Sequence, residues 1–549
     1  MIRRFLVRNE SNLCRVKDAI TGKEIFSSFP EEARLTVYDH DYWWSDAWDP
    51  VDYGRDYDFS RLFFEQLREL IGVVPAPSRN IYQLVNSDYS NNAGELKNCY
   101  LCFNIGKSED SAYIIAASGV KNSFDVNEAM HIELCYESFE IEDCYRTFFS
   151  MFCDKCYDVW FSRNLTGCSN CLGCVNLRNK QYHIFNKPYT RERYFEEIKR
   201  FNLNSYKGLR KVRKEAEDFW RKLPWKFLHG VQNINVSGDF IHHSKNARYC
   251  YNVADCENVR YCQDLSNQGY GGVKDSYDFH NWGDDCELIY ESRGSGYGCR
   301  SVKFSIDCWP ANHDLEYCVR CGSSNNLFGC SGLKKKSYCI LNKQYSKDGY
   351  FALREKIIKH MNEMPYIDKL GRMYRYGEFF PPEFSPFAYN ETIAQDFFQL
   401  AEKEAKEKGY NWREATLRGF RTTIKSEDLP DRSYGADESI LKEIIECSVC
   451  RQAYRIILPE IEFLKHHSIP LPRFCSTCRR KHRLSFRNPP RFYNQKCQCG
   501  GTSDDRKIYK NITSHFHGSS HCPNEFETSY APERPEIVYC EACYQSEVI

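Results

Sequence analysis

One stretch of this chain occurs twice, and this repetition limits the possible folds more than any other feature. Segments 173–190 and 329–346 share Gly, Cys, Leu, Lys, Tyr, Ile, Asn, Lys and Tyr without a gap, at an offset of 156 residues (Cys330 against Cys174). Short Cys- and Tyr-rich segments precede each copy, and a helix-like segment follows each. We therefore expect the middle of the protein to contain one module used twice.

Residues 79–187 form the first of two repetitive arrays. Corners such as Asn98-Cys99-Tyr100 and Asp143-Cys144-Tyr145 recur about every 21 to 24 residues, with short strand-like segments between them. A helical solenoid would need about ten or more helix-forming residues in each repeat, and this array has no such runs. The period and the polar corners therefore predict a parallel β-solenoid, whose stacked coils bury small apolar cysteines in columns.

Residues 232–346 repeat this pattern with less regular spacing. The predicted fold class is mainly β with helical connectors, made of two tandem parallel β-solenoid (β-helix-like) modules and C-terminal zinc ribbons. The remaining segments are a degenerate, metal-free ribbon relic with a capping helix (1–78), a basic helical connector (188–231), a helical exit segment with a linker (347–440) and a zinc-ribbon region (441–549).

The ribbon relic is inferred from a likeness between the two ends of the chain. Segment 3–9 parallels 483–488, and segment 37–43 parallels 538–544. The C-terminal copy carries Cys540 and Cys543, whereas the N-terminal copy has Asp39 and Tyr42 in their places. We interpret the N-terminal copy as a partial ribbon that has lost its metal ligands.

The chain has 549 residues and 29 cysteines. Its first residues include no apolar run long enough for a signal peptide, and no stretch reaches the about 18 apolar residues of a membrane span. We therefore expect a cytoplasmic protein without membrane contact, in which cysteines are core residues or metal ligands rather than disulfides. The formal net charge is zero and names no partner.

The sharpest chemical signal lies in residues 441–549. Four close cysteine pairs occur there: Cys447 with Cys450, Cys475 with Cys478, Cys497 with Cys499, and Cys540 with Cys543. Each pair puts two thiolates on one tight turn, and two such turns complete a tetrahedral structural zinc site. The sequence therefore predicts about two Zn²⁺ ions per chain.

Two pairings of these turns are open. Sequential pairing joins the first turn to the second and the third to the fourth, whereas a cross-brace joins the first to the third and the second to the fourth. Sequential pairing is favoured, because the N-terminal relic parallels the second unit alone. His515, His517, His521 and Cys522 are spare ligands for an accessory metal site.

The same region is basic, with aromatic residues between the basic ones. Such a pattern is typical of phosphate attraction combined with base stacking. Nucleic acid is therefore a candidate partner, through Arg479, Arg480, Lys481, Arg483, Arg487 and Arg491. The alternative is that some of these arginines hydrogen-bond the carbonyls of the zinc-binding turns while the rest are solvated.

Four short segments together resemble a known but uncharacterised family. They are 42–49 (YWWSDAWD), 377–381 (GEFFP) with 385–390 (SPFAYN), and 469–473 (IPLPR) before Cys475. The family consists of predicted zinc-ribbon proteins from uncultured small-genome bacteria, and the resemblance covers most of the chain. It implies zinc ribbons and no established activity. This chain departs from the family at its amino end, where it has Cys14 in place of cysteine pairs.

These observations favour a non-catalytic zinc-binding scaffold or binding protein, whose partner is nucleic acid or another protein. No catalytic residue is predicted. One alternative is an enzyme that acts on a polymer such as a carbohydrate in a groove of the β-solenoid, with Asp284, Asp285, Glu287, Glu291 and His280 as candidate acid–base groups. The other is a purely structural protein that forms oligomers through its ribbons.

Overall fold

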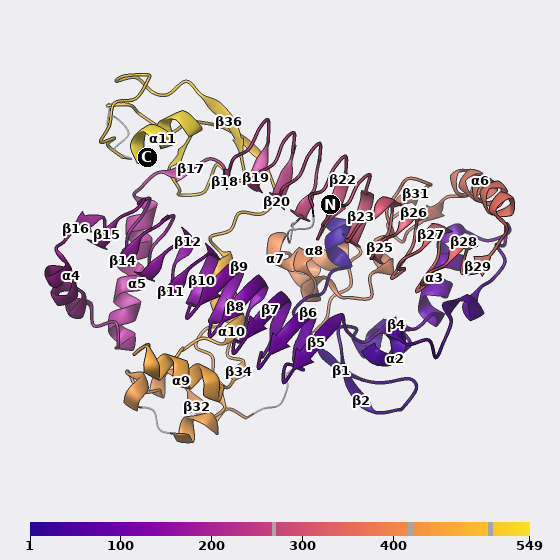
Figure 1. Ribbon diagram of the computed structural model, residues 1–549, viewed down its shortest axis with the longest axis horizontal. Helices are drawn as coiled ribbons and strands as arrows, with labels where there is room; N and C mark the ends of the chain where they lie inside the picture. Colours follow the sequence, from indigo (N-terminus) through magenta and orange to yellow (C-terminus); the bar gives the residue numbers. More distant parts are fainter. Residues whose placement is uncertain (266–270, 415–420, 436–437, 503–508, 549) are drawn as a thin grey trace.

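The computed structural model describes residues 1–265, 271–414, 421–435, 438–502 and 509–548. This part of the chain is mainly β, as predicted, with eleven α-helices and two large sheets that are mostly parallel. Each of the two sheets has twelve strands. Figure 1 shows them as two rows of arrows, β5 to β16 and β18 to β29, with the orange α9 and β32 below the first row and the yellow α11 and β36 beside the start of the second.

The first sheet follows the first repetitive array. Its strands are β5 (Ile81–Val85), β6 (Ser90–Lys97), β7 (Cys102–Glu109), β8 (Ile115–Lys121), β9 (Phe124–Glu133), β10 (Tyr136–Glu142), β11 (Tyr145–Phe148), β12 (Met151–Asp154), β13 (Tyr157–Trp160), β14 (Ser169–Leu172), β15 (Gln181–Ile184) and β16 (Lys187–Pro188). Neighbouring parallel strands pair residues that are twelve positions apart in the sequence. The same offset separates Ser87 from Cys99, and the N–H of Cys99 donates to the Ser87 hydroxyl. The period expected from the cysteine corners is therefore too long, since it spans two repeats.

A three-residue rhythm lies beneath this offset. Nearly every third residue of this array has a left-handed backbone, for example Asn92, Glu95 and Asn98. The residue that follows each of these three points inward and is buried: Ala93, Leu96 and Cys99. The inward positions accept Ala, Ser, Val, Ile and Leu as well as Cys. Cysteines therefore mark only some of the repeats, which is why their spacing in the sequence overstated the period.

Every cysteine of the two sheets is a buried free thiol. The thiols donate to main-chain carbonyls at fixed offsets; Cys156, for example, donates to the carbonyl oxygens of Asp154 (3.3 Å) and Leu165 (3.5 Å). Burial raises the pKa of the Cys135 thiol to about 12. The Cys135 thiol therefore stays neutral and behaves as a small apolar core residue with one weak donor.

The second sheet follows the second array. Its strands are β18 (Gly230–Val231), β19 (Gly238–His242), β20 (Cys250–Ala254), β21 (Gln263–Leu265), β22 (Tyr277–His280), β23 (Tyr290–Ser295), β24 (Arg300–Lys303), β25 (Ile306–Cys308), β26 (His313–Glu316), β27 (Asn325–Phe328), β28 (Ser337–Ile340) and β29 (Lys343–Gln344). Most neighbours pair at the same offset or one position more, as Gly238 with Cys250 and Tyr277 with Tyr290 show.

The duplicated stretch ends both sheets in the same way. The side-chain oxygen of Asn186 accepts from the backbone N–H of Val175, and that of Asn342 accepts from Ser331, both at 2.8 Å. Thr190 then caps helix α4 (Arg191–Ile198), and Ser346 caps α6 (Lys347–Glu363). A hydroxyl at the N-cap satisfies one of the free N–H groups of the first turn, so the repeated sequence stops each sheet and starts a helix.

The two ends of the chain share one order of short elements. The first end contains α1 (Ile2–Leu6), β1 (Cys14–Lys17), β2 (Glu24–Ser27), β3 (Val37–Tyr38) and α2 (His40–Trp44). The last contains α10 (Ser476–Leu484), β35 (Tyr493–Lys496), β36 (Glu525–Thr528), β37 (Val538–Tyr539) and α11 (Glu541–Val548). β3 pairs in parallel with β4 (Ala76–Pro77) just before the first sheet, and β37 pairs with β17 (Trp225–Lys226) just before the second.

The helices that precede the sheets cover them crosswise. Helix α3 (Phe63–Val73) lies before the first sheet in the sequence but packs on the second, where the ring centroids of Phe63 and Phe328 are 5.3 Å apart. Helix α5 (Tyr206–Arg221) packs on the first sheet, and Trp220 donates to the carbonyl of Phe161 (3.2 Å). Each half of the chain therefore supplies cover for the sheet of the other half.

The remaining elements connect these parts. They are β30 (Tyr366–Ile367), β31 (Met373–Tyr374), α7 (Ile393–Phe397), α8 (Glu402–Glu407), β32 (Ile424–Lys425), β33 (Ile445–Glu446), β34 (Ala453–Tyr454) and α9 (Leu458–His466). No helix in the described ranges has the length and apolar character that a membrane crossing requires.

Candidate metal centres

The first group of ligands joins the first two cysteine pairs. The thiol sulfurs of Cys447, Cys450, Cys475 and Cys478 all lie within 4.8 Å of one another. Cys447 follows β33, and Cys475 is the N-cap of α10, so each pair lies on the tight turn that its spacing predicts. The N–H of Cys475 donates to the sulfur of Cys447 (3.3 Å), which favours a thiolate at that position.

The second group is made of cysteines alone. Cys497, Cys522, Cys540 and Cys543 are all buried, with their sulfurs within 4.8 Å of one another. Cys497 follows β35, and Cys540 precedes α11, whose first turn carries Cys543. The N–H of Cys540 donates to the sulfur of Cys497 (3.2 Å), the same arrangement as in the first group.

A third group shares Cys543 and adds two histidines. Cys499, His515, His517 and Cys543 place their ligand atoms within 4.8 Å. Nδ1 of His515 lies 3.5 Å from the sulfur of Cys499, and Nε2 of His517 lies 3.3 Å from that of Cys543. The other ring nitrogens contact Glu547 (3.1 Å, from His515) and the carbonyl of Ser520 (2.6 Å, from His517). Such outer contacts fix the ring and the tautomer of histidines that bind metals.

These groups agree with sequential pairing for the first site and differ from it at the second. Cys522, which the sequence offered only as a spare ligand, takes the place expected for Cys499, while Cys499 joins the histidines. The cross-brace grouping is not formed among the described residues. Spacing alone could not place Cys522, because it has no cysteine beside it; only the fold brings it next to Cys540 (3.8 Å).

The predicted nucleic-acid residues are mostly occupied within the chain. Arg479 pairs with Asp125 (2.8 Å) and Glu460 (2.7 Å), and Arg480 pairs with Asp396 (2.6 Å). Arg483 contacts Asp125 (3.3 Å) and the side chain of Asn127 (2.9 Å). Arg487 pairs with Glu128.

Of the six predicted residues, Lys481 and Arg491 are exposed. Arg479 and Arg483 are buried because α10 packs them on Asp125 of β9. Nucleic-acid contact through this helix therefore has no support in the structure.

Helix α1 makes the matching contact with the second sheet. Arg4 is fully buried and pairs with Asp278 (2.7 Å) and Glu291 (2.8 Å). Arg8 pairs with Asp264 (2.5 Å), and Arg487 from the other end of the chain lies 3.7 Å from the same carboxylate. The sequence likeness between 3–9 and 483–488 thus corresponds to a shared role, in which arginines four residues apart dock a helix on a sheet.

This docking involves two of the groups considered for polymer chemistry. Glu291 pairs with Arg4, and Nε2 of His280 lies 2.9 Å from Nη1 of Arg8, within a buried contact with the ring of Phe5 (centroids 4.2 Å apart). Glu287 lies 3.7 Å from Arg300 on the exposed side of the sheet. Glu291 and His280 therefore already have partners within the docking contact of the N-terminal segment.

His280 gives the docking of α1 a predictable dependence on pH. Burial lowers the pKa of His280 well below its ordinary 6.5, and Arg8, Arg293 and Arg4 lower it further, while Asp264 and Glu10 face Arg8. Below about pH 6.5 the folded chain keeps the His280 ring neutral, whereas in the unfolded chain the ring takes up a proton. Its contribution to stability is therefore complete above about pH 6.5 and is lost as the pH falls below that value.

We expect urea unfolding of the wild type to show this loss as a slope of up to about 1.4 kcal/mol per pH unit below pH 6.5. The variant H280N lacks this proton uptake and should have a flatter profile. His131, whose side chain is 63% exposed, provides the control H131N, which should follow the wild type. Equal slopes for H280N and the wild type would contradict the assignment.

Comparisons with other proteins add little. No protein-family model matches the chain, and no curated protein matches it. A structure described as an acetyltransferase from Desulfovibrio desulfuricans matches at 10% identity, over 54% of this chain and 86% of that chain, with a TM-score of 0.11. A TM-score this low carries no argument about fold or activity. An inference about function therefore rests on the ligand groups and the docking contacts of this chain.

Proposed function

We propose that this chain is a non-catalytic zinc-binding scaffold, in which zinc ribbons hold two tandem parallel β-solenoids together. Paired residues of neighbouring parallel strands are only about twelve positions apart in the sequence, and nearly every third residue makes a turn. This leaves no room for a crossover helix between the strands. Coiling into a solenoid is the arrangement that fits this register. The ribbons are inferred from the cysteine groups that follow short hairpins.

The observation that carries the proposal is the position of the ligand groups. Each group lies at the start of a helix that docks on the first sheet. From the first group, α10 runs directly onto β9 through Arg479 and Arg483. After the second group, Tyr544 in α11 donates to the side chain of Asn176, which lies between β14 and β15 of the first sheet (3.1 Å). β37 pairs with β17, just before the second sheet. Metal binding at these points would fasten both sheets to one C-terminal region.

The donor sets support zinc in a structural role. Thiolates with imidazoles suit Zn²⁺ better than the harder Mg²⁺ or Ca²⁺. The first two groups each offer four thiolates, which fills a tetrahedral site and leaves no position for water or substrate. The third group shares Cys543 with the second and adds three donors of its own. Catalysis by zinc needs such an open position, so a binding or structural role is the better fit.

The test is metal content by mass spectrometry on freshly reduced protein, with the ratio of absorbance at 260 and 280 nm as a check for nucleic acid. We expect zinc to co-purify without nucleic acid. The variant C478A should lose metal, whereas C14A, a thiol outside the three groups, should keep the wild-type content. Absence of metal in the wild type would refute the proposal, and co-purifying nucleic acid would favour a nucleic-acid-binding protein instead.

A further inference from the structure

A cavity of about 540 Å³ lies away from the three metal-ligand groups. Its walls come from the N-terminal segment, the start of the first sheet, the stretch 293–320 of the second sheet and the segment 380–387. Cavities of this volume hold small organic molecules in many proteins. Since no ligand group or docking arginine described above lines it, its chemistry can be considered separately.

The cavity contains more positive charge than the chain neutralises. Arg320 lines it and has no carboxylate within 4 Å among the described residues; its buried Nε and Nη2 have no hydrogen-bond partner. Arg293 is 6% exposed and pairs with Asp307, but its Nε is also unpartnered. Within the described part of the chain, Arg79 donates only to main-chain carbonyls, those of Asp88 and Ser90.

Burial lowers the pKa of Arg320 to about 10 and that of Arg293 to about 9. Guanidinium groups remain charged at neutral pH even so. A buried charge without a counter-charge destabilises the folded chain, and a bound anion would offset that cost at these arginines.

Flat aromatic surfaces lie beside the arginines. Phe29 stacks on Phe387 with ring centroids 5.6 Å apart, and the guanidinium of Arg320 lies 5.8 Å from the centre of the Phe29 ring. Trp44 and Trp309, which also line the cavity, have ring centroids 6.0 Å apart. Aromatic side chains next to arginines provide stacking surfaces for a planar ring and ion pairs for an attached anion.

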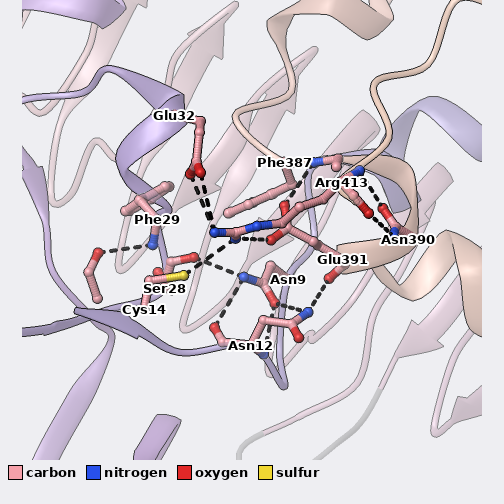
Figure 2. Close-up of polar contacts among 12 residues, drawn as sticks. Asn9, Asn12, Cys14, Ser28, Phe29, Glu32, Phe387, Asn390, Glu391 and Arg413 are labelled. Atoms are coloured by element: carbon pink, nitrogen blue, oxygen red, sulfur yellow. Dashed lines mark hydrogen bonds and ion pairs between the residues drawn. The ribbon is translucent and has the colours of Figure 1, made fainter. Parts of the chain in front are cut away.

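The aromatic wall is held in place before any ligand binds. Figure 2 shows Phe29 and Phe387 beside Arg413, which pairs with Glu391 and, at 3.4 Å, with Glu32. On the same wall, the side chain of Asn9 donates to the carbonyl of Ser28 (2.8 Å). These contacts tie the N-terminal segment to residues 387–413, and a preformed wall lowers the entropy cost of binding.

We propose that this cavity binds a small organic anion that carries a planar aromatic ring, of the nucleoside monophosphate class. The anionic group contacts Arg320 and Arg79, and the ring lies among Phe29, Phe387 and the two tryptophans. Side-chain amides of Asn80 and Asn91 in the same wall offer hydrogen bonds to polar ring edges. This site goes beyond the scaffold role and does not depend on bound zinc.

The test is a titration of the full chain with AMP and GMP, followed by tryptophan fluorescence, because Trp44 and Trp309 line the cavity. We expect saturable quenching that weakens as salt is added. The variants R320M and R79M should each raise the Kd at least tenfold. The matched control R300M changes an exposed arginine of the same sheet and should leave the Kd unchanged.

Two further probes separate the parts of the proposed ligand. Inorganic phosphate and adenosine should each compete more weakly than AMP, because each has only one of the two features. If inorganic phosphate competes as well as AMP, the aromatic part of the proposal is wrong. Lack of quenching by AMP and GMP at millimolar concentration, or equal weakening by R320M and R300M, would overturn the site; circular dichroism of R320M checks that it is folded.

Discussion

Replacing Cys543 by alanine should remove metal from two of the three ligand groups at once, because its sulfur belongs to both. Structural zinc contributes an apparent free energy of about 10–16 kcal/mol in small zinc domains, and this energy is coupled to the folding of the ribbon. We therefore expect C543A to lose zinc and to lose hydrogen-exchange protection across residues 493–502 and 509–548. Metal content by mass spectrometry and hydrogen exchange measure the two effects.

Three control variants make this result specific. C522A removes a ligand of the all-cysteine group alone, and H517A removes a ligand of the mixed group alone. Each should lose less zinc than C543A if both groups bind metal. C478A should leave protection of the same residues intact, since Cys478 belongs to the first group. Wild-type zinc content in C543A would show that neither shared group holds metal.

Replacing Arg479 by alanine should destabilise the protein by about 3–5 kcal/mol, the usual cost of breaking a buried ion pair from one side. Arg479 is 2% exposed and neutralises both Asp125 and Glu460, which are fully buried. Burial raises the pKa of Asp125 to about 7 even beside Arg479 and Arg483, which indicates how unfavourable its charge is in this position. Urea unfolding at pH 7.5 measures the loss.

The matched control is R200A. Arg200 pairs with Glu197 on a helix surface and is 67% exposed, so its loss should cost no more than about 1 kcal/mol. The double variant with R479M and E460Q removes the Arg479–Glu460 pair and keeps Asp125 beside Arg483. It should recover much of the stability lost in R479A, because no carboxylate is left unpaired. Equal effects of R479A and R200A would mean that this cluster does not hold α10 on the first sheet.

The sequence predicted the features that depend on local spacing. The mainly β character follows from short segments between polar corners, and the match between 173–190 and 329–346 corresponds to sheet ends that share an asparagine contact and a capped helix. The first two cysteine pairs lie on tight turns, as their spacing requires. In each case the deciding interactions link residues close in the chain, so the pattern of residue types contains the information.

Other features were decided by contacts between distant segments. The partner of Cys497 is Cys522 rather than Cys499, because a hairpin and a long insertion bring it there. Arg479 and Arg483, which the sequence suggested lie on an exposed surface, are buried because they pair with Asp125 of β9. Composition gives the number of charges but does not show which of them meet from distant parts of the chain. An arginine that is buried against a carboxylate joins two elements of the chain and is not part of an exposed binding surface.

The cavity shows the same limit. Arg79 and Arg320 are far apart in the sequence and belong to no recognisable motif. In the fold, both line the same cavity as Phe29 and Trp309. The sequence by itself therefore determined the repeats, the turns that bear the cysteines and the helix starts, all of which are local. The tertiary structure decided which ligands, charges and rings face one another, because those energies arise only when the two sheets and the two chain ends pack together.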